Sequence, residues 1–346
     1  MSSDEAPLRN LWYMAGFAGK LAKGSLWHKL LLGEPVLIGR TLAGTLFAMR
    51  DICPHRGVPL SAGRATTGGV ECPYHGWQFG SDGVCTHIPS LTTEQDFDPS
   101  RIKVRTYPVR EQDGLIWIYM AAEGQETKAP AQMPPKVPLS NARPRWFESQ
   151  TFQCPIDHAV IGLMDPAHAP FVHGRWWWRV KPRLKEKAYG PLPNGFVMKR
   201  HVPSKPAYRL LGAEVSTEIT FELPSTRFEI VKGRLFGRPI DVIGLTVCTP
   251  MDEHSTQVTQ IQYWPTWLGF IKPFFMAIGR TFLGDDRRMV ELQREGLKFN
   301  PRLMLIQDAD QPAIWYHRIK KSWSEHVATG EPFVNPVGER TLRWRS

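Results

Sequence analysis

Short runs in which apolar and polar residues alternate dominate the first third of the chain. Examples are residues 35–40, 45–50 and 114–120, and glycine, proline and aspartate punctuate the segments between them. A period of two places successive side chains on opposite faces of a strand, so these runs predict β-strands joined by turns. From about residue 26 to residue 120, the pattern therefore predicts an all-β module.

The pattern changes after residue 128. Residues 129–144 are rich in proline and lack periodicity, which is typical of a linker between domains. Residues 145–346 open with a helical pattern at 156–173, continue through five strands and end in helical segments over 273–323. This order predicts an α+β fold for the second part, and we expect domain ranges of 1–128 and 145–346. The five expected strands are 195–201, 213–223, 228–231, 243–249 and 257–263.

Residues 264–283 form the most apolar stretch of the protein. Pro265, Lys272, Pro273 and Arg280 interrupt it, so it falls short of the roughly 20 predominantly apolar residues that a membrane-spanning helix needs. We expect a buried helix here in preference to contact with a membrane or with another subunit.

Two cysteine–histidine pairs lie in the N-terminal module, Cys53-Pro-His55 and Cys72-Pro-Tyr-His75. Together they offer two thiolates and two imidazoles, which suit either a tetrahedral zinc ion or a [2Fe-2S] cluster with two histidines on one iron. Zinc fingers place a cysteine pair before a histidine pair, whereas each half here mixes one of each. The mixed order favours the cluster over zinc.

The remaining cysteines, Cys85, Cys154 and Cys248, have no repeated spacing. We therefore do not expect a disulfide framework. We expect the protein to occupy a reducing compartment. The N-terminal residues lack the basic and apolar regions of a secretory signal, so we expect the chain to be cytoplasmic.

The net charge of +10 is compatible with nucleic acid, a membrane surface or an acidic protein as partner. No aromatic-and-basic recognition motif is present, so we do not expect nucleic acid. Because many cations lie in or near the cluster module, an acidic electron donor is the expected partner. These cations are Arg56, Arg64, Arg101, Lys103, Arg105 and Arg110.

A second group of metal-binding residue types follows the linker: Asp165, His168 and His173. On an ideal helix the two histidines lie about 140° apart around the axis, too far to share one ion. Pro170 lies between them and permits a kink or bulge that lets them converge. Asp165 has two compatible interpretations, as the N-cap of a helix that starts at Pro166 and as a partner that orients the His168 ring.

Two histidines need a carboxylate to complete the facial triad of a non-haem ferrous centre. The late acidic helix offers Asp286, which interrupts an apolar stripe, and metal binding offsets the cost of a carboxylate placed there. Asp285 is the second choice because we expect a more solvated setting for it, and Glu291 is the third. The stripe comprises Phe282, Leu283, Met289, Val290 and Gln293.

These residues carry a resemblance to a known family. Residues 53–60 and 72–79 resemble the Rieske iron–sulfur motif, with Gly57, Pro59, Gly76 and Trp77 beside the ligands. The pattern Asp-x-x-His-x-x-x-x-His, which comes about ninety residues later and precedes an acidic helix, resembles the α subunit of Rieske non-haem iron oxygenases. The likeness covers essentially the whole chain.

The resemblance implies an N-terminal all-β Rieske [2Fe-2S] domain, with Cys53, His55, Cys72 and His75 as cluster ligands. It also implies a helix-grip (START-like) catalytic domain with an antiparallel sheet, a mononuclear Fe(II) and a homotrimer. In such trimers Asp165 links His168 of one subunit to a Rieske histidine, here His75, of the next. Several ring-dihydroxylating members have asparagine four residues before this aspartate, where the chain has Ile161, so its match to that subgroup is weaker.

The expected function is that of a terminal oxygenase, which uses O2 to hydroxylate or oxidatively demethylate a bulky apolar or aromatic substrate. No dinucleotide or phosphate motif is present, so a ferredoxin or a flavin-dependent reductase must supply electrons. Phe152, Ile156 and part of the run 176–178 are expected to line the pocket. Three alternatives remain: a ring cis-dihydroxylating dioxygenase, a Rieske electron-transfer protein without catalysis and a zinc-binding interaction module.

Overall fold

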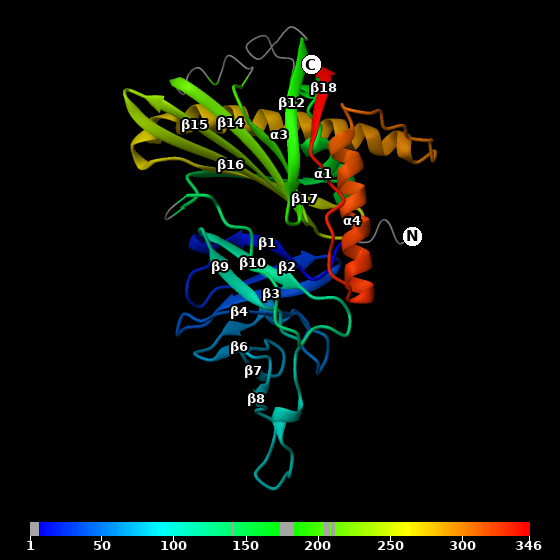
Figure 1. Ribbon diagram of the computed structural model, residues 1–346. Helices are drawn as coiled ribbons and strands as arrows, with labels where there is room; N and C mark the ends of the chain where they lie inside the picture. Colours follow the sequence, from blue (N-terminus) through cyan, green and yellow to red (C-terminus); the bar gives the residue numbers. More distant parts are fainter. Residues whose placement is uncertain (1–6, 140–141, 174–182, 204–207, 209–211) are drawn as a thin grey trace. The chain divides into compact units, whose positions relative to one another are not determined.

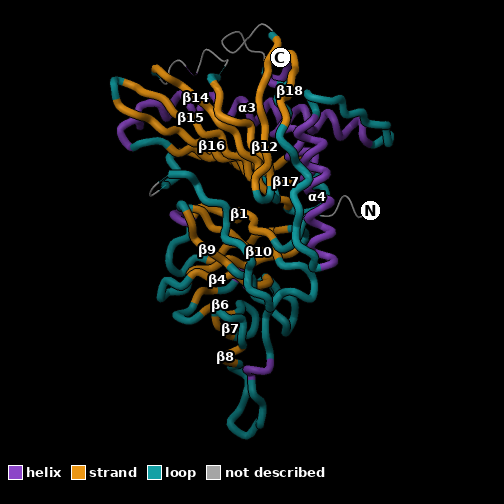
Figure 2. The backbone as a smooth tube through the Cα atoms, in the orientation of Figure 1, coloured by secondary structure: helices purple, strands orange, loops and turns teal. Residues whose placement is uncertain are grey.

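The computed structural model of the protein describes residues 7–139, 142–173, 183–203, 208 and 212–346 (Figure 1). The chain forms two compact units, of which the first spans Arg9–Lys136 and the second contains Val137–Ser346. The boundary between them therefore lies inside the proline-rich segment 129–144. All α-helices of the described residues belong to the second unit, whereas strands and loops make up most of the first (Figure 2).

The first unit contains three small antiparallel sheets, as its alternating runs predict. Their strand orders are β1-β10-β9, β2-β3-β4 and β5-β6-β7-β8. The strands are β1 (Leu11–Phe17), β2 (Leu26–Leu31), β3 (Glu34–Arg40), β4 (Leu46–Arg50), β5 (Arg64–Ala65), β6 (Gly69–Glu71), β7 (Gln78–Gly80), β8 (Cys85–His87), β9 (Val109–Gln112) and β10 (Leu115–Met120).

The second unit is built on one eight-stranded antiparallel sheet (Figure 1). The five expected strands are confirmed as β13 to β17, and three further strands, β11, β12 and β18, complete the sheet in the order β11-β17-β16-β15-β14-β13-β12-β18. The bounds are β11 (Trp146–Phe152), β12 (Leu184–Leu192), β13 (Gly195–His201), β14 (Ala213–Glu222), β15 (Thr226–Leu235), β16 (Arg238–Pro250), β17 (Thr256–Tyr263) and β18 (Arg340–Arg345).

Four α-helices of the described residues accompany this sheet: α1 (Ile156–Met164), α2 (Ala169–Val172), α3 (Lys272–Leu297) and α4 (Gln311–Thr329). Helix α1 packs on β16 and β17 and also contacts α3 and α4, while α3 contacts β11 and α2. A long helix held against a large antiparallel sheet is the helix-grip arrangement, so the expected α+β fold is confirmed (Figure 1). This packing brings α2 and the middle of α3 together over the sheet.

The helical pattern expected at residues 156–173 is confirmed only in part, because it forms two separate helices. Helix α1 ends at Met164, Asp165 is its C-cap, and α2 begins only after His168. Asp165 therefore does not cap a following helix; its Oδ1 instead accepts a hydrogen bond of 2.7 Å from the backbone N–H of Ala167. This local bond competes with helix continuation and turns the chain between the two helices.

The buried helix expected over residues 264–283 is only partly correct. Trp264 and Leu268 are buried, but Phe270 is exposed, and the segment starts with a 3₁₀ helix at Thr266–Ile271 before α3 begins at Lys272. In the part of the chain that the structure describes, no helix is both long and apolar enough to cross a membrane.

Candidate metal centres

The two cysteine–histidine loops of the first unit have the same backbone hydrogen bonds. The N–H of Gly57 donates to the carbonyl of Cys53 at 2.9 Å, and that of Gly76 donates to the carbonyl of Cys72 at 3.1 Å. Both glycines have positive φ, 75° and 68°, which favours glycine over residues with a Cβ. A tight turn thus follows each cysteine and brings the next histidine to the tip of its loop.

The core of the first unit fixes the inner ends of these loops. Cys53 and Cys72 are buried in an apolar cluster to which β3, β4, β6 and β7 contribute. Just before Cys53, the buried carboxylate of Asp51 accepts hydrogen bonds from the N–H and Oγ of Ser61 at 2.7 and 2.6 Å. Nδ1 of His28 lies 2.6 Å from the same carboxylate. These bonds tie the start of the first loop to Ser61, which follows it, and to His28 on β2.

The two imidazoles lie at the outer side of the pair of loops. The ring centroids of His55 and His75 are 4.6 Å apart, and the Trp77 ring stacks on His55 at 4.5 Å. His55 is partly exposed and His75 is exposed, in contrast to the buried thiols. Two thiols on the inner side and two imidazoles on the outer side fit a [2Fe-2S] cluster whose two irons carry different ligands.

The pKa values of these groups agree with such a site. Burial, together with the neighbouring Cys72 thiol, raises the pKa of Cys53 to about 11, so Cys53 forms a thiolate at neutral pH only when a bound cation compensates the charge. Burial and the charges of His75 and Arg56 lower the pKa of His55. Its neutral form, which is the form that binds metals, is therefore favoured.

The second candidate centre lies around α2. This helix has only one turn, with His168 as its N-cap and His173 as its C-cap. Because the two histidines flank a separate short helix, the 140° separation expected on one long helix does not apply. Their ring centroids lie 5.4 Å apart, with the ring planes inclined at 72°.

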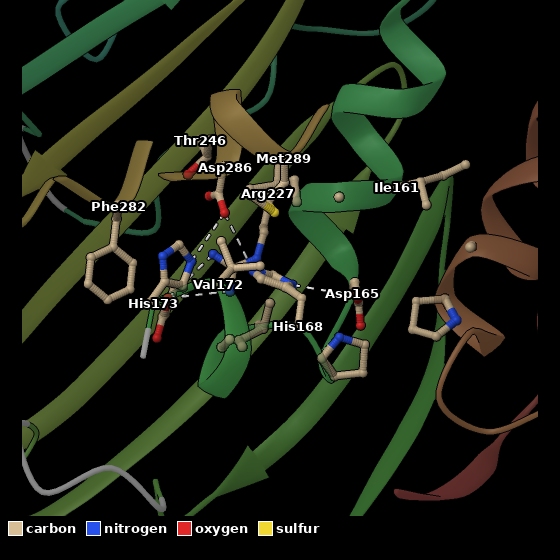
Figure 3. A pocket seen from close by; sticks show the side chains of 18 of the residues that line it. Ile161, Asp165, His168, Val172, His173, Arg227, Thr246, Phe282, Asp286 and Met289 are labelled. Atoms are coloured by element: carbon tan, nitrogen blue, oxygen red, sulfur yellow. Dashed lines mark hydrogen bonds and ion pairs between the residues drawn. The ribbon is translucent and has the colours of Figure 1, made fainter. Parts of the chain in front are cut away.

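Helix α3 adds a carboxylate to these two rings (Figure 3). Oδ1 of Asp286 lies 3.1 Å from Nε2 of His173 and 3.7 Å from Nε2 of His168. One ligand atom from each of the three residues falls within 4.8 Å of the other two. Two imidazole nitrogens and one carboxylate oxygen that converge in this way fit the facial triad of a non-haem iron site.

The other ring nitrogens, both Nδ1 atoms, point to carboxylates as well. Oδ2 of Asp165 lies 3.6 Å from Nδ1 of His168, and Oδ2 of Asp285 lies 3.6 Å from Nδ1 of His173. Both Nδ1 atoms are buried and have no hydrogen bond within the described residues. Metal-binding histidines commonly direct their second nitrogen to a carboxylate, so this arrangement agrees with Nε2 as the ligand atom in both rings.

The more solvated setting expected for Asp285 is wrong. Its side chain is 25% exposed, compared with 33% for Asp286. Asp285 turns back toward the buried ring of His173, whereas Asp286 faces the cavity with the rest of its stripe. The expected helix face is thus confirmed, but spacing on α3 alone could not reveal the contact between Asp285 and a ring from α2.

A cavity of about 520 Å³ opens beside the three converging residues. Phe152 lines it as expected, whereas Ile156 is buried elsewhere, and the run 176–178 lies outside the described residues. The walls are less apolar than the sequence predicts, because the strands and Tyr208, which lies between β13 and β14, also contribute charged and polar side chains. These are Lys185, Lys187, His201, Tyr208, Thr217, Arg227, Glu229, Thr246 and Gln260.

Comparisons with known proteins agree with both candidate centres. The Rieske [2Fe-2S] domain family matches residues 11–108, and the vanillate O-demethylase oxygenase C-terminal domain family matches residues 152–326, just over half of the chain. The chain belongs to the Rieske-type oxygenases. Members of this family combine a [2Fe-2S] cluster with a mononuclear non-haem iron, and the two sets of side chains described above fit these two cofactors.

Two curated members of the family illustrate how far the likeness extends. Chlorophyllide a oxygenase from Chlamydomonas reinhardtii is 38% identical over 350 residues, which cover 96% of this chain and 51% of that protein. The oxygenase component of dicamba O-demethylase from Stenotrophomonas maltophilia is 34% identical over 171 residues, 48% of each chain. The chain spans about half the length of these relatives.

Solved structures show the same fold. Dicamba monooxygenase bound to 3,6-dichlorosalicylic acid superposes with a TM-score of 0.72 at 23% sequence identity, over 93% of this chain and 98% of that one. A likeness at this level of identity is evidence for the Rieske oxygenase fold alone.

Proposed function

We propose that the protein is the terminal oxygenase component of an electron-transfer system, and that it hydroxylates or oxidatively demethylates an aromatic or otherwise bulky organic substrate. The observation that carries this proposal is the convergence of His168, His173 and Asp286 at a cavity, in the same chain as a complete set of cluster ligands. A Rieske protein that only carries electrons needs neither the triad nor the cavity.

Metal analysis tests this proposal against the electron-carrier alternative. We expect three irons and two acid-labile sulfides per chain, because the triad holds one iron in addition to the two of the cluster. A ratio of two irons to two sulfides after anaerobic reconstitution with Fe(II) would support the carrier. Zinc without cluster absorption would support the zinc-binding module.

In the proposed site Cys53, His55, Cys72 and His75 hold the cluster, and His168, His173 and Asp286 hold the iron. When bound, the cluster supplies single electrons and the iron activates O2. The three ligand residues would hold the iron at the wall of the cavity, and the substrate would bind in the cavity beside it. Phe282 stacks on the His173 ring at 4.0 Å and limits the movement of that ligand.

Asp165 is proposed as the electron bridge between subunits of a homotrimer. Its carboxylate lies beside Nδ1 of His168, and its side chain is 31% exposed, so one edge is available to a group from outside the unit. His75 is exposed on its own loop and is the proposed partner from the neighbouring subunit. The contact of Asp165 with His168 supports one half of this bridge.

Asp285 is proposed to position His173. Replacing Asp285 with alanine removes the carboxylate beside Nδ1, so the ring orientation becomes less defined and we expect the site to bind Co(II) about tenfold more weakly. Spectrophotometric titration with Co(II) measures this in protein whose cluster is intact. Asp285→Asn keeps an acceptor at the same place and should retain most of the affinity. Unchanged Co(II) binding in Asp285→Ala would contradict the positioning role.

An acidic ferredoxin or a flavin-dependent reductase is the proposed electron donor. Arg56, Arg101, Lys103 and Arg110 are exposed on the cluster unit and support such docking. Two of the six cations named from the sequence contribute less, because Arg64 pairs with Glu71 at 2.7 Å and Arg105 pairs with Glu34 at 3.3 Å.

Hydroxylation or demethylation is favoured over ring dihydroxylation. Ile161, which replaces the asparagine of several dihydroxylating members, lines the cavity, so the difference lies at the site itself. The name of the dicamba O-demethylase relative supports demethylation. The cysteines outside the proposed cluster site, Cys85, Cys154 and Cys248, form no disulfide within the described residues, which supports the proposed location in the reducing cytoplasm.

A further inference from the structure

One wall of the cavity beside the triad carries lysines. Lys185 and Lys187 both line the cavity because residues two apart on β12 face the same side of the sheet. Glu186, between them, points to the other side and pairs with Arg343 at 2.7 Å. The strand thus directs its two lysines toward the cavity and its glutamate away from it. On an ordinary solvated strand, the lysines would point to water.

The neighbouring strand adds a histidine to this wall. The pairing of β13 with β14 shifts register between Met198 and His201, and this irregularity allows both residues to line the cavity although they are three apart. Nδ1 of His201 lies 2.9 Å from the carbonyl of Lys199, so its N–H donates there. Nε2 of the neutral ring can then only accept a hydrogen bond, which leaves the binding of an anion to the lysines of this wall. The Lys187 charge contributes to lowering the pKa of His201, after burial, which indicates that the two side chains are neighbours.

The other cations of the cavity already have partners. Nζ of Lys185 donates to Oγ of Ser346 at 2.7 Å. Arg227 pairs with Glu229 at 3.3 Å, and that carboxylate also accepts a hydrogen bond from Tyr208. Lys187 differs, since none of the described carboxylates lies within ion-pair distance of its ammonium group. It is nevertheless partly buried, and burial and the charge of Arg183 lower its pKa.

We propose that the substrate carries an anionic group, a carboxylate or sulfonate, that binds to Lys187. This inference rests on the proposed function, because it names the class of molecule that the oxygenase site takes. A partly buried ammonium group gains most from a charged acceptor, and a charge-assisted hydrogen bond there also orients the ligand. A cavity of about 520 Å³ accommodates an acid with several aromatic rings beside the triad.

Two fluorescent probes of nearly the same shape test the anion site without any turnover. 8-Anilinonaphthalene-1-sulfonate carries the anion, and N-phenyl-1-naphthylamine is the same molecule without it. Both are titrated into wild-type protein and into three variants. Lys187→Gln removes the charge, Lys187→Arg keeps it, and Lys232→Gln removes a matched charge from an exposed position on β15, away from the cavity lining.

We expect the sulfonate probe to bind Lys187→Gln about tenfold more weakly than wild type, whereas Lys187→Arg and Lys232→Gln bind it as wild type does. The uncharged probe should bind all four proteins equally. The anion site would be overturned if Lys187→Gln and Lys232→Gln lost affinity for the sulfonate probe equally. It would also be overturned if neither variant lost affinity.

The iron content of each variant is measured in the same preparations. We expect three irons per chain throughout, because Lys187 does not contact the triad. Two irons with selective loss of the sulfonate probe in Lys187→Gln would retain the anion site and reject the oxygenase function. Three irons without a selective loss of affinity for the sulfonate probe would retain the oxygenase function and reject the anion site.

Discussion

Asp286→Ala is expected to abolish turnover while the protein keeps its cluster colour. Oδ1 of Asp286 is the atom on which both Nε2 nitrogens converge, so its removal leaves two imidazoles without the carboxylate that completes the triad. We expect iron to fall from three to two per chain and substrate-dependent O2 uptake to fall by more than about 10³-fold, a loss of roughly 4 kcal/mol in transition-state stabilisation. Iron analysis, visible absorption and an oxygen electrode measure the three quantities.

Glu291→Ala is the matched control for this experiment. Glu291 lies on the same helix and pairs with Arg287 at 3.5 Å, with its side chain 39% exposed, and it is absent from the cavity lining. We expect three irons and nearly normal turnover in this variant. Retained turnover in Asp286→Ala would reject Asp286 as a ligand and direct attention to Asp285.

Asp165→Asn is expected to separate the two centres electronically. The asparagine has nearly the same shape but no charge, so both the cluster and the iron should bind as in wild type. Turnover should fall by about 10–100-fold, the usual range for a residue that acts through a metal ligand. Stopped-flow absorption then measures reoxidation of the reduced cluster by O2 in the presence of substrate, and we expect this step to be slow.

Asp310→Asn controls for loss of a negative charge at the cavity. Asp310 also lines it, but its carboxylate accepts a hydrogen bond from the N–H of Ile306 and makes no ion pair with either triad histidine. Cluster reoxidation should be normal in this variant. Rapid reoxidation in Asp165→Asn would show that electrons take a path without this carboxylate.

Mixed oligomers test whether the path runs between subunits. A chain with Asp286→Ala lacks the iron, and a chain with Cys72→Ser lacks the cluster, so each is inactive alone. When the two are co-expressed, a cluster of one subunit can serve the iron of its neighbour, and we expect activity to return in part. Complete inactivity of purified mixed trimers would contradict transfer between subunits.

Much of the fold followed from local patterns. Strands β13 to β17 contain the apolar and β-branched runs that mark strands, and their positions were predicted within a few residues. Strand β12 was missed because its Lys-Glu-Lys sequence lacks the apolar face that marks a strand. The inward face of β12 carries lysines because it lines the cavity. The same lysines that made the strand hard to predict therefore include the residue proposed to bind the substrate, Lys187.

The break at Asp165 shows a different limit of sequence reasoning. A helical period continues through residues 156–173, and Pro170 was the obvious place for a kink. In the structure Pro170 lies within the first turn of α2, where proline is tolerated, and the chain turns earlier at Asp165. Two local conformations compete at Asp165: a continued helix, and a turn held by the side-chain hydrogen bond to the backbone two residues ahead. Because their free energies are similar, packing against α3 and the sheet decides between them.

The sequence by itself determined the metal chemistry. Each cluster loop holds one cysteine and one histidine within four residues, and His168 and His173 are five residues apart, so short-range spacing places these groups together in any fold that forms the loops. Only the tertiary structure decided which carboxylates serve each ring and what else lines the cavity. Asp285 lies more than one hundred residues from His173 in the sequence, and the wall with Lys187 and His201 exists only because two strands pair. Such contacts depend on how helices and strands pack together and not on the residue spacing within any one of them.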